Sequence, residues 1–137
     1  MRLEGRLWKS GEHWLIEVPA LAAMTQGKTK AEAYEMIGDL IATMANNPEL
    51  EVTVEPAGSE AFTISANRTG ILVALLLRRQ RERQGITLAE AAARLNQTSR
   101  NAYARYEQGQ SVPTLEKLEE LLQAVAPDQQ LVLRLAA

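Results

Sequence analysis

Two short helical segments, joined by a turn of a few residues, constrain the fold of this chain more than any other feature. Thr87 and Glu90 have the spacing of a capping box, which predicts that a helix starts with LAEAAARL. NQT is a tight connection, and TSRNAYARYEQG (residues 98–109) has polar residues at its start and a glycine stop, as a second helix would. Two capped helices this close together have the form of a helix-turn-helix.

Helical patterning continues on both sides of this pair. ILVALLLRRQRERQ precedes it, and QSVPTLEKLEELLQAV follows Gly109 with one apolar stripe that Pro127 ends. The second half is therefore predicted to contain four short helices. The last segment, QQLVLRLAA, alternates Leu131, Leu133 and Leu135 with other residues, which predicts a C-terminal strand. Such a strand needs a partner, either the sheet or its own copy in a second subunit.

The first half has the period of β-structure. Trp14, Ile16 and Val18 alternate along one arm of a predicted hairpin, KSGE supplies its turn, and Pro19 ends it. AAMTQG is a candidate third strand. A helix then begins at a capping box formed by Thr29 and Glu32 and stops at NNP.

Two further strands, EVTVEP and AFTIS, complete the first half. The predicted fold class is α+β: a small antiparallel sheet with a helix on one face, followed by an all-α domain with a C-terminal strand. The polar stretch SANRTG marks the boundary, so the predicted domains are residues 1–67 and 68–137.

The charges differ between these halves. Residues 1–67 carry 5 Lys/Arg and 10 Asp/Glu, a net charge of −5, whereas residues 68–137 carry 10 and 7, a net charge of +3. This asymmetry is consistent with a different partner for each half, although random scatter of surface charge explains it equally well.

Composition narrows the class of protein. The chain has no cysteine, which excludes disulfides and cysteine-based zinc sites and fits a reducing compartment. Its longest apolar run, ILVALLL, is far shorter than the ~20 residues of a membrane span, and its start lacks a signal-peptide core. We therefore expect a cytoplasmic protein with no membrane partner.

Catalytic residues are sparse. His13 is the only histidine and falls at a predicted hairpin turn, while Asp39 and Asp128 are the only aspartates. No set of side chains has the spacing of metal ligands, and no glycine-rich loop connects a strand to a helix. We expect no enzyme activity, no metal and no cofactor.

The second half resembles the lambda-repressor-like (XRE) helix-turn-helix family. The resemblance lies in G-I-T, A-E-A-A, S-R-N-x-Y-x-R-Y-E-x-G and P-x-L-x-x-L, and it covers about residues 70–126. The chain departs from the family at Leu88, Gln97 and Tyr103, where the family often has glutamine, glycine and an aliphatic residue.

The resemblance implies that residues 98–109 enter the major groove of DNA. A serine would cap this recognition helix, two arginines and an asparagine would read bases, and two loop residues would contact the DNA backbone. The alternative is that the same side chains only solvate an exposed face. The candidate DNA-binding residues are Ser99, Arg100, Asn101, Arg105, Gln110 and Ser111.

The resemblance gives other residues a structural role. Tyr103 and Tyr106 are expected to pack inward. A glutamate repels phosphate, and in the family it pairs with an arginine of the first helix. Glu107 and Arg81 are therefore expected to form an ion pair.

The first half resembles the HicB antitoxins through VPALAAMTQGKTKAEAYEMIGDLI. The resemblance spans about residues 1–66. It implies a partial RNase H-like sheet without catalytic carboxylates, which covers the active site of a HicA toxin, a small basic ribonuclease that cleaves mRNA. Trp8, Trp14 and ALAAMTQG are candidate toxin contacts, although tryptophan in a small sheet is more often core.

Together the two resemblances imply an antitoxin that neutralises a HicA-type toxin and represses its own operon by binding operator DNA. It would act as a homodimer or a higher homo-oligomer. The alternative is a stand-alone transcription regulator whose N-terminal domain binds a small ligand or another protein.

Overall fold

The computed structural model describes residues 1–96 and 100–136; for Arg100 it describes the backbone alone. The chain divides into two compact units, Met1–Leu76 (unit 1) and Leu77–Ala137 (unit 2). The division falls inside helix α2 (Thr69–Gln84), later than the boundary expected at residues 67–68. The reason is that Leu72 and Leu75, in the first turns of α2, belong to the core of unit 1.

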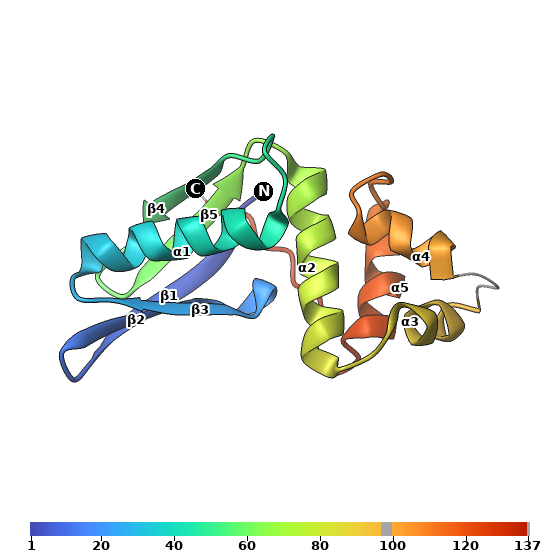
Figure 1. Ribbon diagram of the computed structural model, residues 1–137, viewed down its shortest axis with the longest axis horizontal. Helices are drawn as coiled ribbons and strands as arrows, with labels where there is room; N and C mark the ends of the chain where they lie inside the picture. Colours follow the sequence, from blue (N-terminus) through green and yellow to red (C-terminus); the bar gives the residue numbers. More distant parts are fainter. Residues whose placement is uncertain (97–99, 137) are drawn as a thin grey trace. The chain divides into compact units, whose positions relative to one another are not determined.

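Unit 1 is an antiparallel sheet with one helix, as the α+β prediction requires (Figure 1). The sheet has the order β3-β2-β1-β5-β4, and all of its pairings are antiparallel. Its elements are β1 (Leu3–Ser10), β2 (His13–Val18), the 3₁₀ turn η1 (Pro19–Leu21), β3 (Ala23–Gly27), α1 (Lys30–Ala45), β4 (Val52–Pro56) and β5 (Ala61–Ala66).

Local sequence explains the connections in unit 1. Gly11 has a φ of +62° in the turn between β1 and β2, a conformation that glycine adopts without steric cost. Pro19 ends β2 and opens η1. The Thr29 side chain accepts a hydrogen bond of 3.1 Å from the backbone N–H of Glu32, so the predicted cap of α1 is confirmed.

Helix α1 lies along one face of the sheet (Figure 1). Ala33, Ile37 and Ile41 are buried on its inner side and share a core with Leu7 and Ile16 of the sheet. The first turn of α1 also lies close to β3, because a Cβ on Gly27 would lie only 2.5 Å from the backbone nitrogen of Ala33. The RNase H-like character of this unit stays a prediction.

Unit 2 consists of the C-terminal part of α2 and three shorter helices, α3 (Leu88–Arg94), α4 (Arg100–Glu107) and α5 (Leu115–Val125). Thr87 and Thr114 cap α3 and α5 by accepting hydrogen bonds of 3.1 Å from the backbone. The buried residues of this core include Leu77, Tyr103 and Leu121.

Two glycines end helices in the same way. At the end of α2, Gly85 has a φ of +70°, its N–H donates to the carbonyl of Glu82, and the N–H of Ile86 donates to the carbonyl of Arg81. At the end of α4, Gly109 has a φ of +74° with the equivalent pair of bonds. Both are Schellman motifs, which satisfy the last carbonyls of a helix.

The predicted C-terminal strand is not formed in this structure. Residues 129–136 adopt neither helix nor strand, and all of them are exposed. Alternation of side chains predicts which residues share a face but supplies no partner, and a single strand is not stable without one. In the described part of the chain, no helix is both long and apolar enough to cross a membrane.

Candidate nucleic-acid interface

Helices α3 and α4 form the predicted pair in the structure. The capped α3 ends at Leu95, and Asn96 follows with a φ of +57°. Asparagine tolerates this left-handed conformation better than most residues, and it lies one residue before Gln97, where the lambda-repressor-like family that this half resembles often has a glycine. Residues 97–99 are outside the described part, and α4 begins at Arg100.

The inner side of α4 is held by an ion pair. The Arg81 guanidinium donates from Nε to Glu107 Oε2 at 2.7 Å and from Nη2 to Oε1 at 3.0 Å. Nη1 of Arg81 also donates to the carbonyl of Ile86 at 2.9 Å. The two side chains are only 14% and 5% exposed, so the expected pairing of Glu107 with Arg81 is confirmed as a buried contact.

The ion pair changes the pKa of Arg81 and of a neighbouring tyrosine. The hydrogen bond to Glu107 raises the pKa of Arg81, which keeps the guanidinium charged. Tyr103 is fully buried beside the pair, as expected, and burial raises the pKa of its hydroxyl, with the Glu107 carboxylate adding to the rise. That hydroxyl forms no hydrogen bond within the described residues. Tyr106 is half-buried.

The outer side of α4 is polar. Asn101 and Arg105 are exposed, and they lie four positions apart on the helix, which places them on one face. Arg100 is the first residue of α4, but its side chain is outside the description, as is the whole of Ser99. Of the four candidate residues on the recognition helix, the structure therefore places two, Asn101 and Arg105, on an exposed polar face.

The two loop candidates lie between α4 and α5. Gln110 and Ser111 are exposed directly after the Gly109 turn, and the backbone N–H of Gln110 is used by the Schellman bond to Arg105. The groups that remain to donate to a phosphate are therefore the two side chains and the backbone N–H of Ser111.

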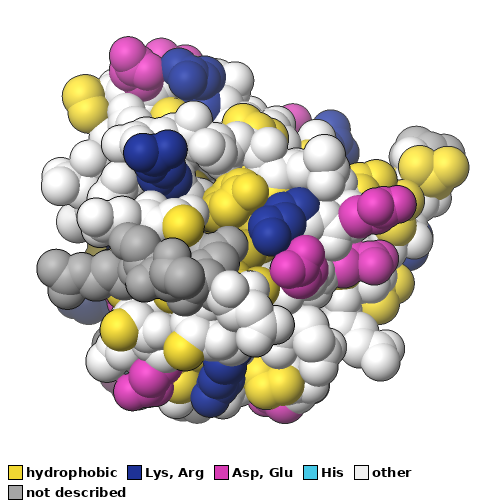
Figure 2. Space-filling model, turned by 90° about the vertical axis from the view of Figure 1, so that its right-hand side faces the viewer, with side chains coloured by type: hydrophobic (Ala, Val, Ile, Leu, Met, Phe, Trp, Pro, Cys, Tyr) yellow, Lys and Arg dark blue, Asp and Glu magenta, His cyan; other side chains and the backbone are white. Residues whose placement is uncertain are grey.

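Charge around the candidate interface is mixed. Figure 2 shows basic side chains separated from one another, with acidic and apolar side chains between them. Several arginines of unit 2 are engaged within the unit: Arg83 donates to Asp128 at 2.9 and 3.1 Å, and Arg94 donates to the carbonyl of Ala124 at 2.8 Å. A surface of this kind favours a few specific contacts over a strong non-specific attraction to DNA.

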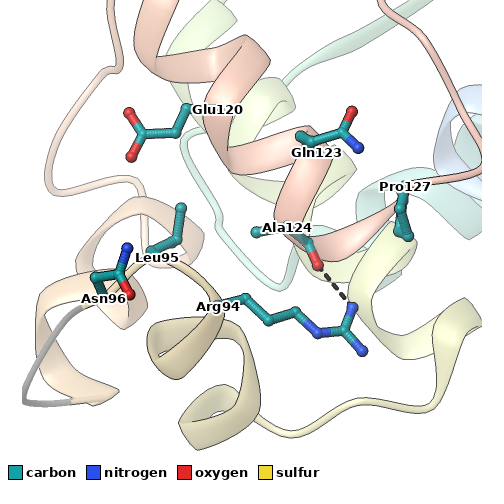
Figure 3. A pocket seen from close by; sticks show the side chains of 7 residues that line it. All are labelled: Arg94, Leu95, Asn96, Glu120, Gln123, Ala124 and Pro127. Carbon is teal, nitrogen blue, oxygen red and sulfur yellow. Dashed lines mark hydrogen bonds between the residues drawn. The ribbon is translucent and has the colours of Figure 1, made fainter.

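Sequence reasoning missed the contacts that tie α5 to its neighbours. Figure 3 shows Arg94 reaching from α3 to Ala124 of α5 along a shallow hollow of about 600 Å³. Asp128, just after α5, accepts from Arg83 and from Gln84 Nε2 at 2.7 Å. These partners are 30 to 45 residues apart in the chain, and no local pattern links them.

Comparison with models of known protein families supports the helix-turn-helix assignment. A family model described as a helix-turn-helix domain matches residues 72–135, which include α3, the turn, α4 and α5. No curated protein matches the chain. The match and the geometry of α3, α4 and α5 both support a helix-turn-helix in this part of the chain, which suggests DNA binding and a role in transcription regulation.

Proposed function

We propose that this chain is an antitoxin that binds and neutralises a HicA-type ribonuclease through unit 1 and represses its own operon through unit 2. Both actions are binding, and we propose no catalytic step and no cofactor. The observation that carries the DNA-binding part is the exposed face of α4, with Asn101 and Arg105, held by the buried pair of Arg81 and Glu107.

Chemistry supports base recognition by this face. An arginine binds guanine O6 and N7 with two hydrogen bonds, and an asparagine binds adenine N6 and N7 in the same manner. Arg100 and Arg105 are proposed to read guanine and Asn101 to read adenine, with Ser99 as the helix cap. Gln110 and Ser111 would fix the position of the domain through phosphate contacts.

The HicB part is supported by what the motif residues do in unit 1. Leu21 is buried after Pro19 opens the turn, Gly27 allows α1 to approach β3, and Thr29 caps α1 above the buried Ala33. Each of these motif residues thus has a structural role in unit 1. A chain in which the motif residues have these roles is expected to share the local fold of the HicB antitoxins, and for this reason we propose a HicB-like unit.

We propose the face of the sheet opposite α1 as the toxin-binding surface. Trp8 pairs with Leu15 across β1 and β2 and therefore shares its face, while Met24 of β3 lies on that face opposite Glu17 and is 52% exposed. Arg6 lies 5.0 Å from the Trp8 ring centroid and leaves the tryptophan half-buried. Trp14, in contrast, packs against the core and is less suited to a contact.

Acidic side chains would assist the approach of a basic toxin. Residues 1–67 have a net charge of −5, and Glu4 and Glu17 lie on the same face of the sheet as Trp8. Such a field raises association rates with a basic partner more than it raises affinity.

Co-purification tests the antitoxin proposal. The tagged chain, isolated from its native cells, should bring with it a small basic ribonuclease whose mRNA cleavage is blocked by added purified chain. Met24→Arg should lose this partner, whereas Val112→Arg, at an exposed site in unit 2, should retain it. If no ribonuclease is recovered, the antitoxin proposal fails and the alternative, a stand-alone regulator whose N-terminal unit binds a small ligand or another protein, replaces it.

A further inference from the structure

The outer side of α4 carries an apolar residue between its two polar ones. Asn101, Ala102 and Arg105 are the exposed side chains in the described part of this helix, whose inner side buries Tyr103 and Ala104. Asn101 and Ala102 lie four and three positions before Arg105, so both flank it on one face. The proposed reading of adenine and guanine by the polar side chains gives the methyl group of Ala102 no role.

We infer that Ala102 contacts the C5 methyl group of a thymine in the major groove and thereby adds a base preference to unit 2. The inference rests on the proposed binding of operator DNA by α4, and it names a base that the polar side chains do not read. An A·T pair presents adenine N6 and N7 together with the thymine methyl group on its major-groove edge. Where Asn101 binds adenine, the paired thymine therefore presents its methyl group to the same helix.

The size and polarity of alanine suit this contact. Its methyl group forms no hydrogen bond, and contact with a thymine methyl group removes apolar surface of both groups from water. A longer side chain at this position would hold the helix farther from the base edges that Asn101 and Arg105 must reach. On the inner side of α4, the buried pair of Arg81 and Glu107 fixes the rotation of the helix, which keeps Ala102 on the outer face.

A purely helix-forming role for Ala102 is the alternative. Alanine has the highest helix propensity, and exposed alanines occur in many helices for that reason alone. Ala93 of α3 is also exposed in unit 2 and supplies a matched control for this role. The two roles differ in one measurable respect, because only a contact with thymine depends on the methyl group of the base.

Replacement of thymine by deoxyuridine tests the contact, because it removes the C5 methyl group and keeps every hydrogen-bonding group of the base. The probe is the operator duplex identified by footprinting the DNA upstream of the chain's own coding sequence. One thymine is replaced at a time, and the affinity is measured by fluorescence anisotropy. For the unmodified chain, deoxyuridine at the contacted position should weaken binding about fourfold, the equivalent of the ~0.8 kcal/mol that burial of one such group contributes.

Ala102→Gly should bind the thymine and deoxyuridine duplexes equally at that position, whereas Ala93→Gly should retain the fourfold difference. Each result is a ratio of two affinities of one variant, so a loss of helix stability caused by glycine cancels. Operator binding that responds to no deoxyuridine, or a response that Ala102→Gly retains, overturns the inference and leaves the proposed DNA binding intact. Absence of operator binding by the unmodified chain overturns both.

Discussion

Arg81 of α2 and Glu107 of α4 form a buried ion pair with two hydrogen bonds, 2.7 and 3.0 Å long. The pair joins the helix that opens the domain to the last residue of the proposed recognition helix. Since the same arginine also binds the carbonyl of Ile86, it fixes the turn that leads into α3. The position of α4 therefore depends on a contact that does not itself face DNA.

Removal of one partner should destabilise unit 2. Glu107→Ala leaves the mostly buried Arg81 guanidinium without its carboxylate partner, and we expect the free energy of unfolding to fall by about 2 kcal/mol. Urea unfolding followed by circular dichroism at a helical wavelength measures this loss. Glu116→Ala, at an exposed position of α5, is the control and should change the value by less than about 0.5 kcal/mol.

Both tryptophans, Trp8 and Trp14, lie in unit 1, so tryptophan fluorescence reports the unfolding of that unit during the same titration. A Glu107→Ala protein whose helical transition is unshifted would show that the pair contributes nothing to the position of α4.

The Tyr103 hydroxyl should be dispensable. It is fully buried and forms no hydrogen bond of normal geometry among the described residues, so its interaction with the nearby Glu107 carboxylate offsets only part of the desolvation cost. Tyr103→Phe should leave the stability of unit 2 unchanged or raise it by about 1 kcal/mol. A loss of more than this in thermal or urea unfolding would mean that the hydroxyl has a partner in solution.

Two glycine-to-alanine substitutions should change the free energy of unfolding in opposite directions. Gly85 has a φ of +70° and open space around its Cβ position, so Gly85→Ala should cost about 1 kcal/mol through backbone strain alone. Gly38 lies inside α1, where an added Cβ would make an ordinary contact of 3.5 Å with Val54, so Gly38→Ala should stabilise unit 1 by about 0.5–1 kcal/mol. Equal effects of the two changes in urea unfolding would contradict the assignment of Gly85 to a Schellman motif.

Asp128 provides a pH-dependent contact. The hydrogen bond from Arg83 lowers the pKa of Asp128 below its ordinary value of 3.8. A lowered acid pKa means that the contact stabilises the folded state above the unfolded pKa and is lost as the pH falls through the lower, folded value. An NMR titration of the carboxyl carbon should give a midpoint below 3.8, and Arg83→Ala should raise the midpoint toward that value. A midpoint unaffected by Arg83→Ala would show that another group lowers the pKa.

Local signals predicted most elements of the fold. Thr29 and Thr87 cap helices as their spacing to Glu32 and Glu90 indicated, because a capping bond involves only neighbouring residues. Gly11 and Gly109 lie at turns for the same local reason. The order of the strands was not predicted, since pairing of β1 with β5 joins residues far apart in the chain and no local pattern specifies it.

The candidate site was predictable only in part. The pairing of Arg81 with Glu107 came from a family resemblance, because the two residues are 26 positions apart. No sequence pattern indicated the contact of Arg83 with Asp128, since the side chain of a surface arginine can reach many carboxylates. The prediction of a C-terminal strand was wrong for the single chain. Alternation of apolar side chains indicates which of them share a face, whereas a strand also needs a neighbouring strand with which it pairs.

The most direct test of the central claim, that α4 reads DNA, compares two double variants by fluorescence anisotropy. The probe is the operator segment identified by footprinting the DNA upstream of the chain's own coding sequence. Arg100→Ala with Arg105→Ala should weaken binding by about a hundredfold, since each lost bidentate contact is worth about 1–3 kcal/mol. Arg2→Ala with Arg68→Ala removes the same charge from exposed positions of unit 1 and should leave the affinity unchanged. Equal affinities of the two double variants for this DNA would contradict the account.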